Sequence, residues 1–183
     1  MLKELYVALL ISFLSIGAAQ ADQYDRRLPE LFDKLRTAQN PTDAKVAEKL
    51  IWEIWYHTPN ATAGNLLSNG MHAMVTHDYA GALGNFNQLI ALIPDFAEAW
   101  HKRATVLMMM QEYDQAKTDL EKVLELEPHH FSALTRLAYV HLFKGQEKQA
   151  LSIFRRVLEI NPYLTSVRQT IDDLQLKLED RPL

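Results

Sequence analysis

A 34-residue spacing runs through most of this 183-residue chain and constrains its fold more than any other feature. Prolines, alanines and large apolar residues each recur at this spacing, after a first interval of 35 residues in each series. The members are Pro59, Pro94, Pro128 and Pro162, then Ala47, Ala82, Ala116 and Ala150, then Ile51, Phe86, Leu120 and Phe154. Three independent series with one period indicate a stack of similar structural units.

Each unit has the pattern of two short amphipathic helices. The proline follows the second helix and stops it, because proline lacks an N–H group and clashes with the preceding turn. Alanine at a shared position lets two helices approach closely, since a larger side chain would overpack the contact. Asp78 and Asp114 are expected to cap the second helices of their units. A single helix pair cannot bury its apolar face, so the pattern predicts an all-α stack of such pairs.

This unit resembles the tetratricopeptide repeat. Residues 97–130 match that family best, with Trp100, Ala104 and Tyr113 at the positions that its pattern favours. Residues 63–96 and 131–164 carry the same pattern with departures, such as His141 in place of an aromatic residue. The resemblance implies a right-handed α-solenoid of helix–turn–helix repeats with these boundaries.

Helical segments are expected on both sides of these three units. Residues 22–62 are interpreted as an N-terminal helical hairpin, a degenerate repeat, and residues 165–183 as a capping helix and tail with a helical apolar stripe. Trp52 and Trp55 are expected to be core between the hairpin and the next unit, the alternative being an exposed binding patch. The pattern of residues 31–58, followed by repeats, also resembles that of a small family of exported bacterial repeat proteins linked with cell-envelope integrity.

Residues 1–21 have the layout of a cleaved secretory signal peptide. Lys3 precedes a mostly apolar run over residues 5–16, and Ala19 and Ala21 form a small-residue cleavage pattern before Asp22. The run is too short to span a bilayer. Glu4 departs from a positively charged start, which leaves a retained anchor or a buried helix as alternatives. We expect cleavage after Ala21 and a periplasmic location.

Composition argues against several classes of function. The chain has a formal net charge of −4, so it offers no basic field for nucleic acid or anionic lipid. It contains no cysteine, and it has no phosphate-binding loop or catalytic motif of the common classes. Of its seven histidines, His129 and His130 are adjacent, so their side chains are expected to diverge. We therefore expect no metal, no cofactor and no catalysis.

The resemblance implies a concave groove lined by the first helix of each unit. The groove is expected to have a methionine-rich floor, suited to an adaptable peptide surface, and two cations that could grip a carboxylate. Its expected lining residues are Leu67, Met71, Met74, His101, Lys102, Thr105, Met108, Arg136, Tyr139 and Leu142. Val75, Met109 and Phe143 map to the same face. The alternative is that the methionines are packing and that Lys102 and Arg136 pair with Glu98 or other carboxylates.

Family members that clamp a C-terminal carboxylate carry lysine and asparagine where this chain has Leu67 and Met71, so chaperone-tail recognition is not expected. The sequence favours a non-catalytic periplasmic interaction module or scaffold that supports cell-envelope integrity and binds a peptide or helix of an envelope protein. Contact with a membrane would come only through a partner or an uncleaved signal. The alternatives are an assembly factor for a periplasmic protein such as a c-type cytochrome, and a self-associating structural protein.

Overall fold

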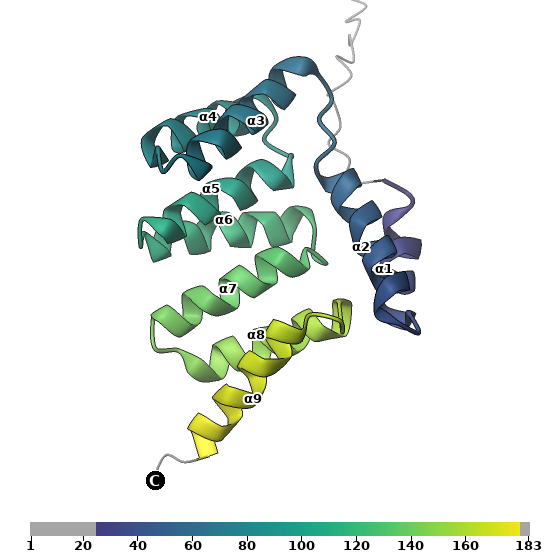
Figure 1. Cartoon of the computed structure of the whole chain (residues 1–183). Coiled ribbons are helices and arrows are strands. Elements are labelled where there is room, and N and C mark those ends of the chain that lie inside the picture. Colours follow the sequence, from purple (N-terminus) through teal and green to yellow (C-terminus); the bar gives the residue numbers. More distant parts are fainter. Residues whose placement is uncertain (1–24, 180–183) are drawn as a thin grey trace, which may run out of the picture.

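The computed structural model describes residues 25–179, and within this range it holds nine α-helices and no strand (Figure 1). The helices are α1 Leu28–Thr37, α2 Pro41–Trp55, α3 Ala61–Val75, α4 Tyr79–Leu92, α5 Ala97–Met109, α6 Tyr113–Leu126, α7 Phe131–Phe143, α8 Glu147–Ile160 and α9 Thr165–Glu179. None of them is long and apolar enough to cross a membrane. The expected signal peptide lies outside the described residues.

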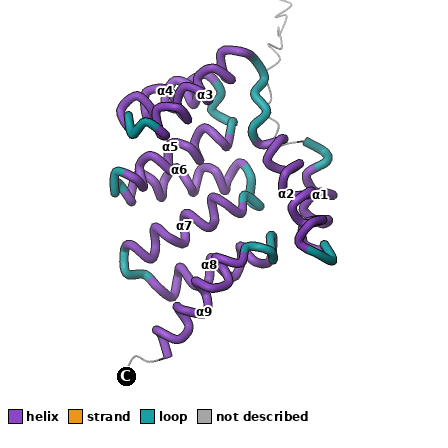
Figure 2. The backbone as a smooth tube through the Cα atoms, in the orientation of Figure 1, coloured by secondary structure: helices purple, strands orange, loops and turns teal. Residues whose placement is uncertain are grey.

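Helices α3 to α9 form a solenoid in which each helix packs on the next (Figure 2). The pairs α3–α4, α5–α6 and α7–α8 are the three expected helix–turn–helix units, and α9 packs on α8 at the end of the stack. The alanines expected at close helix contacts are all 0% exposed; they are Ala82, Ala104, Ala116, Ala138 and Ala150. The prediction of an all-α solenoid of helical repeats is confirmed.

The turn inside each repeat has the same backbone shape. His77, Gln111 and Gly145, which occupy the same position in successive repeats, all have positive φ angles of 61°, 63° and 71°. This left-handed conformation reverses the chain after the first helix and is unfavourable for residues other than glycine. The repeat therefore imposes its turn geometry even where the local residue does not prefer it.

The expected helix caps are only half correct. Asp78 caps α4, since its carboxylate accepts a hydrogen bond from the backbone N–H of Gly81 at 2.9 Å. The expectation for Asp114 is wrong. Asp114 follows the cap residue Glu112 and lies in the first turn of α6. It forms an ion pair with Lys144 of the next repeat.

The N-terminal hairpin α1–α2 does not stack on α3 as a further repeat. It lies beside the solenoid, where α1 packs against α8 (Figure 1). The loop between α1 and α2 is tied to the turn after α8, because the Tyr163 hydroxyl donates to the Ala38 carbonyl at 2.7 Å. The expectation that Trp52 and Trp55 pack between the hairpin and the next unit is therefore wrong.

The two tryptophans are core between the hairpin and the start of α7. The ring of Trp55, 3% exposed, lies 5.2 Å from that of Phe131, and the Trp52 ring lies 5.8 Å from it. The apolar side of the hairpin joins one core with α7, α8 and α9. The hairpin thus buries its apolar side on the flank of the later repeats, which serves its need for burial as well as stacking would.

Gly70 and Gly84 provide a paired test of the α3–α4 contact. A Cβ atom at Gly70 would lie 2.5 Å from a ring carbon of Phe86, whereas no atom of the described part of the chain lies within 4 Å of one at Gly84. An overpacked contact lowers the free energy of unfolding by about 1–3 kcal/mol. Replacing a helical glycine by alanine raises it by roughly 1 kcal/mol. We expect Gly70→Ala to lower the free energy of unfolding by about 1 kcal/mol and Gly84→Ala to raise it. Urea unfolding measures both, and a Gly70→Ala protein more stable than wild type would contradict the contact.

Candidate functional site

The first helices of the three repeats, α3, α5 and α7, lie side by side and form the face expected to bind a partner (Figure 1). The hairpin covers the side of this face that lies near the N-terminal ends of α5 and α7. Lys102 on α5 donates to the Tyr56 hydroxyl just after α2 at 2.5 Å, and its Nζ lies 4.9 Å from the centre of the Tyr56 ring. The Trp52 ring lies 6.3 Å from that of His101. The face is therefore divided into a covered part and an open part.

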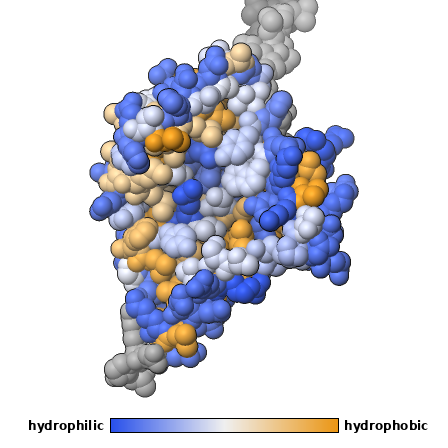
Figure 3. Space-filling view, in the orientation of Figure 1, coloured by the Kyte–Doolittle hydropathy of each residue, from blue (hydrophilic) through white to orange (hydrophobic). Residues whose placement is uncertain are grey.

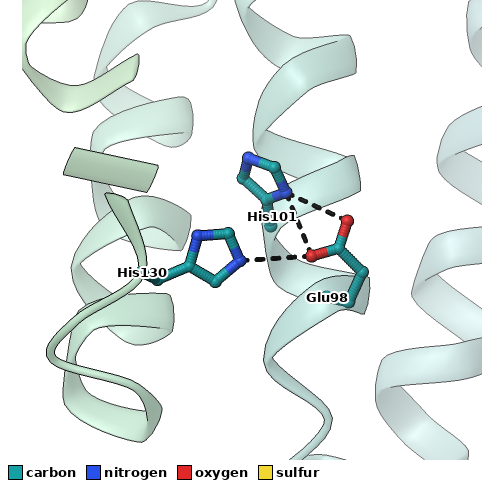
Figure 4. Close-up of side chains that lie close together, drawn as sticks. All are labelled: Glu98, His101 and His130. Carbon is teal, nitrogen blue, oxygen red and sulfur yellow. Dashed lines mark hydrogen bonds and ion pairs between the residues drawn. The ribbon is translucent and has the colours of Figure 1, made fainter. Parts of the chain in front are cut away.

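A buried carboxylate, Glu98 on α5, is the centre of the covered part. Glu98 is 1% exposed, and three residues surround its two oxygens with donors. His101 Nδ1 lies 3.1 and 3.2 Å from the two oxygens, and His130 Nε2 lies 3.2 Å from one of them (Figure 4). Lys102 Nζ lies 3.0 Å from the other oxygen. The carboxylate is fully engaged by its own chain.

The remaining contacts of the two imidazoles fix where their protons lie. The backbone N–H of Ala133 donates to His130 Nδ1 at 3.1 Å, so His130 carries its proton on Nε2 and donates it to Glu98. Arg136 Nε donates to His101 Nε2 at 3.2 Å, so His101 carries its proton on Nδ1 and also donates to Glu98. Both histidines are neutral in this arrangement, and His130 additionally caps α7.

The charges of this cluster shift the pKa values of its members. Burial alone would raise the pKa of Glu98, but the interactions with His101, His130 and Lys102 hold it well below its ordinary value. Burial lowers the pKa of His101 to about 4. Burial alone would also lower the pKa of Lys102, but Glu98 and the Tyr56 hydroxyl raise it overall. At neutral pH the cluster therefore holds a carboxylate, an ammonium and neutral His101.

The same three residues, Glu98, His101 and His130, have ligand atoms within 4.8 Å of one another, which is close enough for one metal ion. Their hydrogen bonds do not fit that use. A metal on His130 Nε2 would move the proton to Nδ1, where it would face the donating N–H of Ala133. A metal on His101 Nδ1 would likewise place a proton opposite Arg136 Nε. The cluster is a hydrogen-bonded core, and the local cations further disfavour a divalent ion.

Aromatic rings cover the cluster from the hairpin side. Trp55 stacks on His130 with ring centres 4.0 Å apart and planes inclined by 5°. Trp52 meets the same imidazole edge-on at 5.8 Å. The Trp55 indole N–H is buried without a hydrogen-bond partner among residues 25–179, so ring packing holds this side chain in place. The hairpin and the buried cluster thus form one unit.

The expected groove residues fall into three groups. Leu67, His101 and Thr105 are buried, so the expectation that they line an open groove is wrong. The side chain of Lys102 is 13% exposed and paired with Glu98, as the alternative interpretation held. The remaining residues are half-buried or exposed and lie on the open part; they are Met71, Met74, Met108, Arg136, Tyr139 and Leu142.

An exposed apolar series runs along the open part. Val75, Met109 and Phe143 recur at the repeat spacing and are 78%, 49% and 59% exposed. We call these three residues the apolar ladder. Apolar side chains gather along this side of the face, away from the hairpin (Figure 3). Leu176 on α9 is 61% exposed and was not predicted, although it follows Leu142 at the repeat spacing.

A separate pocket of about 840 Å³ lies between α1, the turn before α7 and the end of α8. It combines three arginines with four carboxylates, so its lining has no dominant charge. The lining also includes His129, whose exposed side chain points away from the buried His130 cluster, as the expected divergence of the two histidines requires.

The low pKa of His101 predicts a pH dependence of stability. Its folded pKa of about 4 lies below the ordinary value of 6.5, so the unfolded chain binds the additional proton between these values. Stability must then fall as the pH falls through this window, by roughly 2 kcal/mol between pH 7 and pH 5. Urea unfolding at the two pH values measures the loss. We expect His101→Gln to remove most of it and the exposed-site control His72→Gln to keep it; equal losses in all three proteins would contradict the assignment.

The comparisons with known proteins agree with the architecture. The tetratricopeptide repeat profile matches residues 95–162. A TPR repeat-containing protein of Rhizobium etli is 34% identical over 110 residues, which cover 60% of this chain and 54% of that protein. The chain thus spans about half the length of this relative.

Two solved structures share the fold. MamA superimposes with a TM-score of 0.61 at 22% identity, over 81% of this chain and 84% of MamA. The first TPR of Spaghetti (RPAP3), bound to an HSP90 peptide, superimposes with a TM-score of 0.62 at 17% identity, over 65% of this chain and 94% of that one. The profile match, the relative and the shared fold together support the tetratricopeptide repeat as the building unit of this solenoid.

Proposed function

We propose that this chain is a non-catalytic interaction module that binds a peptide or helix of a partner protein on the open part of its concave face. The observation that carries the proposal is the apolar ladder. Soluble proteins rarely leave an aligned series of large apolar side chains in water unless another surface covers it. Methionine side chains next to the ladder, such as Met71 and Met108, can adapt to the shape of a partner.

The covered part of the face gives the binding surface its limits. Lys102, His101 and Glu98 are engaged with one another and with the hairpin, so they stabilise the fold and are not free for a partner. The ligand would therefore lie across the C-terminal ends of α3, α5 and α7. The RPAP3 domain, which has a similar fold, is bound to an HSP90 peptide. Because Leu67 is buried and Met71 is apolar, we propose a different kind of segment for this chain.

The proposed setting is the bacterial periplasm. The layout of residues 1–21 supports export, and the resemblance of residues 31–58 to exported repeat proteins supports a role in cell-envelope integrity. A scaffold of this kind would act by holding an envelope protein in place. Its affinity would come from burial of the apolar ladder.

Photo-crosslinking tests the proposed surface. A crosslinking amino acid at Met109, 49% exposed on the ladder, is compared with one at Leu92, 48% exposed on α4 outside the ladder. In the native bacterium we expect Met109 to capture one envelope protein that Leu92 does not capture. The same captured proteins at both positions would contradict the proposed surface. Capture of this chain alone would favour self-association.

The proposed export makes a separate prediction about the N-terminus. Mass spectrometry of a periplasmic extract should find a mature chain that begins at Asp22. Ala21→Leu should block cleavage and leave the longer chain with the membrane fraction, because the cleavage site needs a small residue at this position. An uncleaved wild-type chain in the cytoplasm would contradict the periplasmic setting without affecting the proposed binding surface.

A further inference from the structure

The apolar ladder has a spacing that limits the shape of its ligand. Helices α3, α5 and α7 are neighbours, and packed helices lie about 8–10 Å apart. Each helix contributes one exposed member of the ladder near its C-terminus. A half-buried row beside it, Met74, Met108 and Leu142, recurs at the repeat spacing and widens the apolar surface. A ligand that follows the ladder must present an apolar group about every 10 Å along a broad stripe.

An α-helix meets this requirement and a β-strand does not. Two helical turns advance about 10.8 Å, so residues seven apart would meet successive members of the ladder. A β-strand returns to the same face at about 6.6 Å or about 13 Å, and neither value matches. The three members would then contact a helix of about 15 residues, since two intervals of about 10 Å correspond to about 20 Å.

The charge of the face indicates which polar residues the helix carries. The only carboxylate on α3, α5 and α7 is Glu98, which is buried and already engaged. Arg136 on α7 is half-buried and donates to His101 through Nε, and no carboxylate among residues 25–179 forms an ion pair with its guanidinium. The open part is thus locally cationic within a chain of net charge −4, and it is complementary to acidic groups.

We infer that the partner segment is an amphipathic α-helix with apolar residues at seven-residue intervals along the ladder and acidic residues on the flank that faces Arg136. This inference rests on the proposed function and specifies its ligand. The apolar side of the helix covers the ladder, and a carboxylate on its flank reaches the open edge of the Arg136 guanidinium.

Selection from a phage library of random 20-residue peptides against the full chain tests the inference, because the library favours no conformation in advance. We expect the selected peptides to share apolar residues seven positions apart, to carry glutamate or aspartate, and to gain helical circular dichroism on binding. Met109→Lys with Phe143→Lys should weaken their binding at least about tenfold. The control Leu92→Lys should change it less than about twofold. Circular dichroism and melting must first show that each variant is folded.

Arg136→Gln tests the charge separately. This variant should weaken the binding of acidic peptides by about fivefold, as expected for one partly exposed ion pair. It should leave the binding of glutamine-substituted versions of the same peptides nearly unchanged. Proline-rich peptides with a three-residue period would overturn the helical ligand and leave the proposed function standing. Basic peptides would overturn the charge assignment. Peptides insensitive to the ladder variant, no selected peptide, or a dimer of this chain that the ladder variant abolishes would overturn both.

Discussion

The buried carboxylate of Glu98 is the interaction on which the rest of the structure depends. An ionised carboxylate removed from water costs several kcal/mol unless donors surround it. Here the donors come from α5 itself and from His130 at the start of α7, so the charge links two successive repeats. The hairpin joins the same unit, because Trp55 stacks on His130 and Tyr56 accepts from Lys102. Removing any one donor would leave the buried carboxylate short of a hydrogen bond or of its ion pair at the point where three parts of the chain meet.

This arrangement explains why one face of a regular solenoid has two different halves. The part of this face near the N-terminal helix ends is closed by aromatic packing over a satisfied polar cluster. The part near the C-terminal helix ends keeps the apolar ladder in water, and the Arg136 guanidinium there forms no ion pair with a carboxylate among the described residues. The hairpin therefore forms a fixed wall beside the proposed binding surface. Its apolar residues, such as Ile51 and Trp55, are too deeply buried for it to serve as a loose lid.

Periodicity was enough to predict the repeats, because Pro94, Ala116 and Phe154 occupy positions whose steric demands are local to each helix pair. It could not place the hairpin, since the apolar side of α1 and α2 fits the flank of α7 and α8 as well as it would fit α3. It also could not reveal the Glu98 cluster, because His130 stands 32 residues away and meets Glu98 only when two repeats stack. The interpretation of Lys102 as a partner of Glu98 was available from their spacing on one helix turn.

The placement of the hairpin is tested most directly by a distance between α1 and α8. Arg36 and Arg156 line the same pocket, and the chain has no native cysteine, so spin labels on Arg36→Cys and Arg156→Cys report this pair alone. Pulsed electron paramagnetic resonance should give a single narrow distance well below about 30 Å. A hairpin stacked in front of α3 would separate the labels by three repeats, about 30 Å at about 10 Å per repeat. A distance of that length would contradict the docking of the hairpin, and with it the division of the concave face.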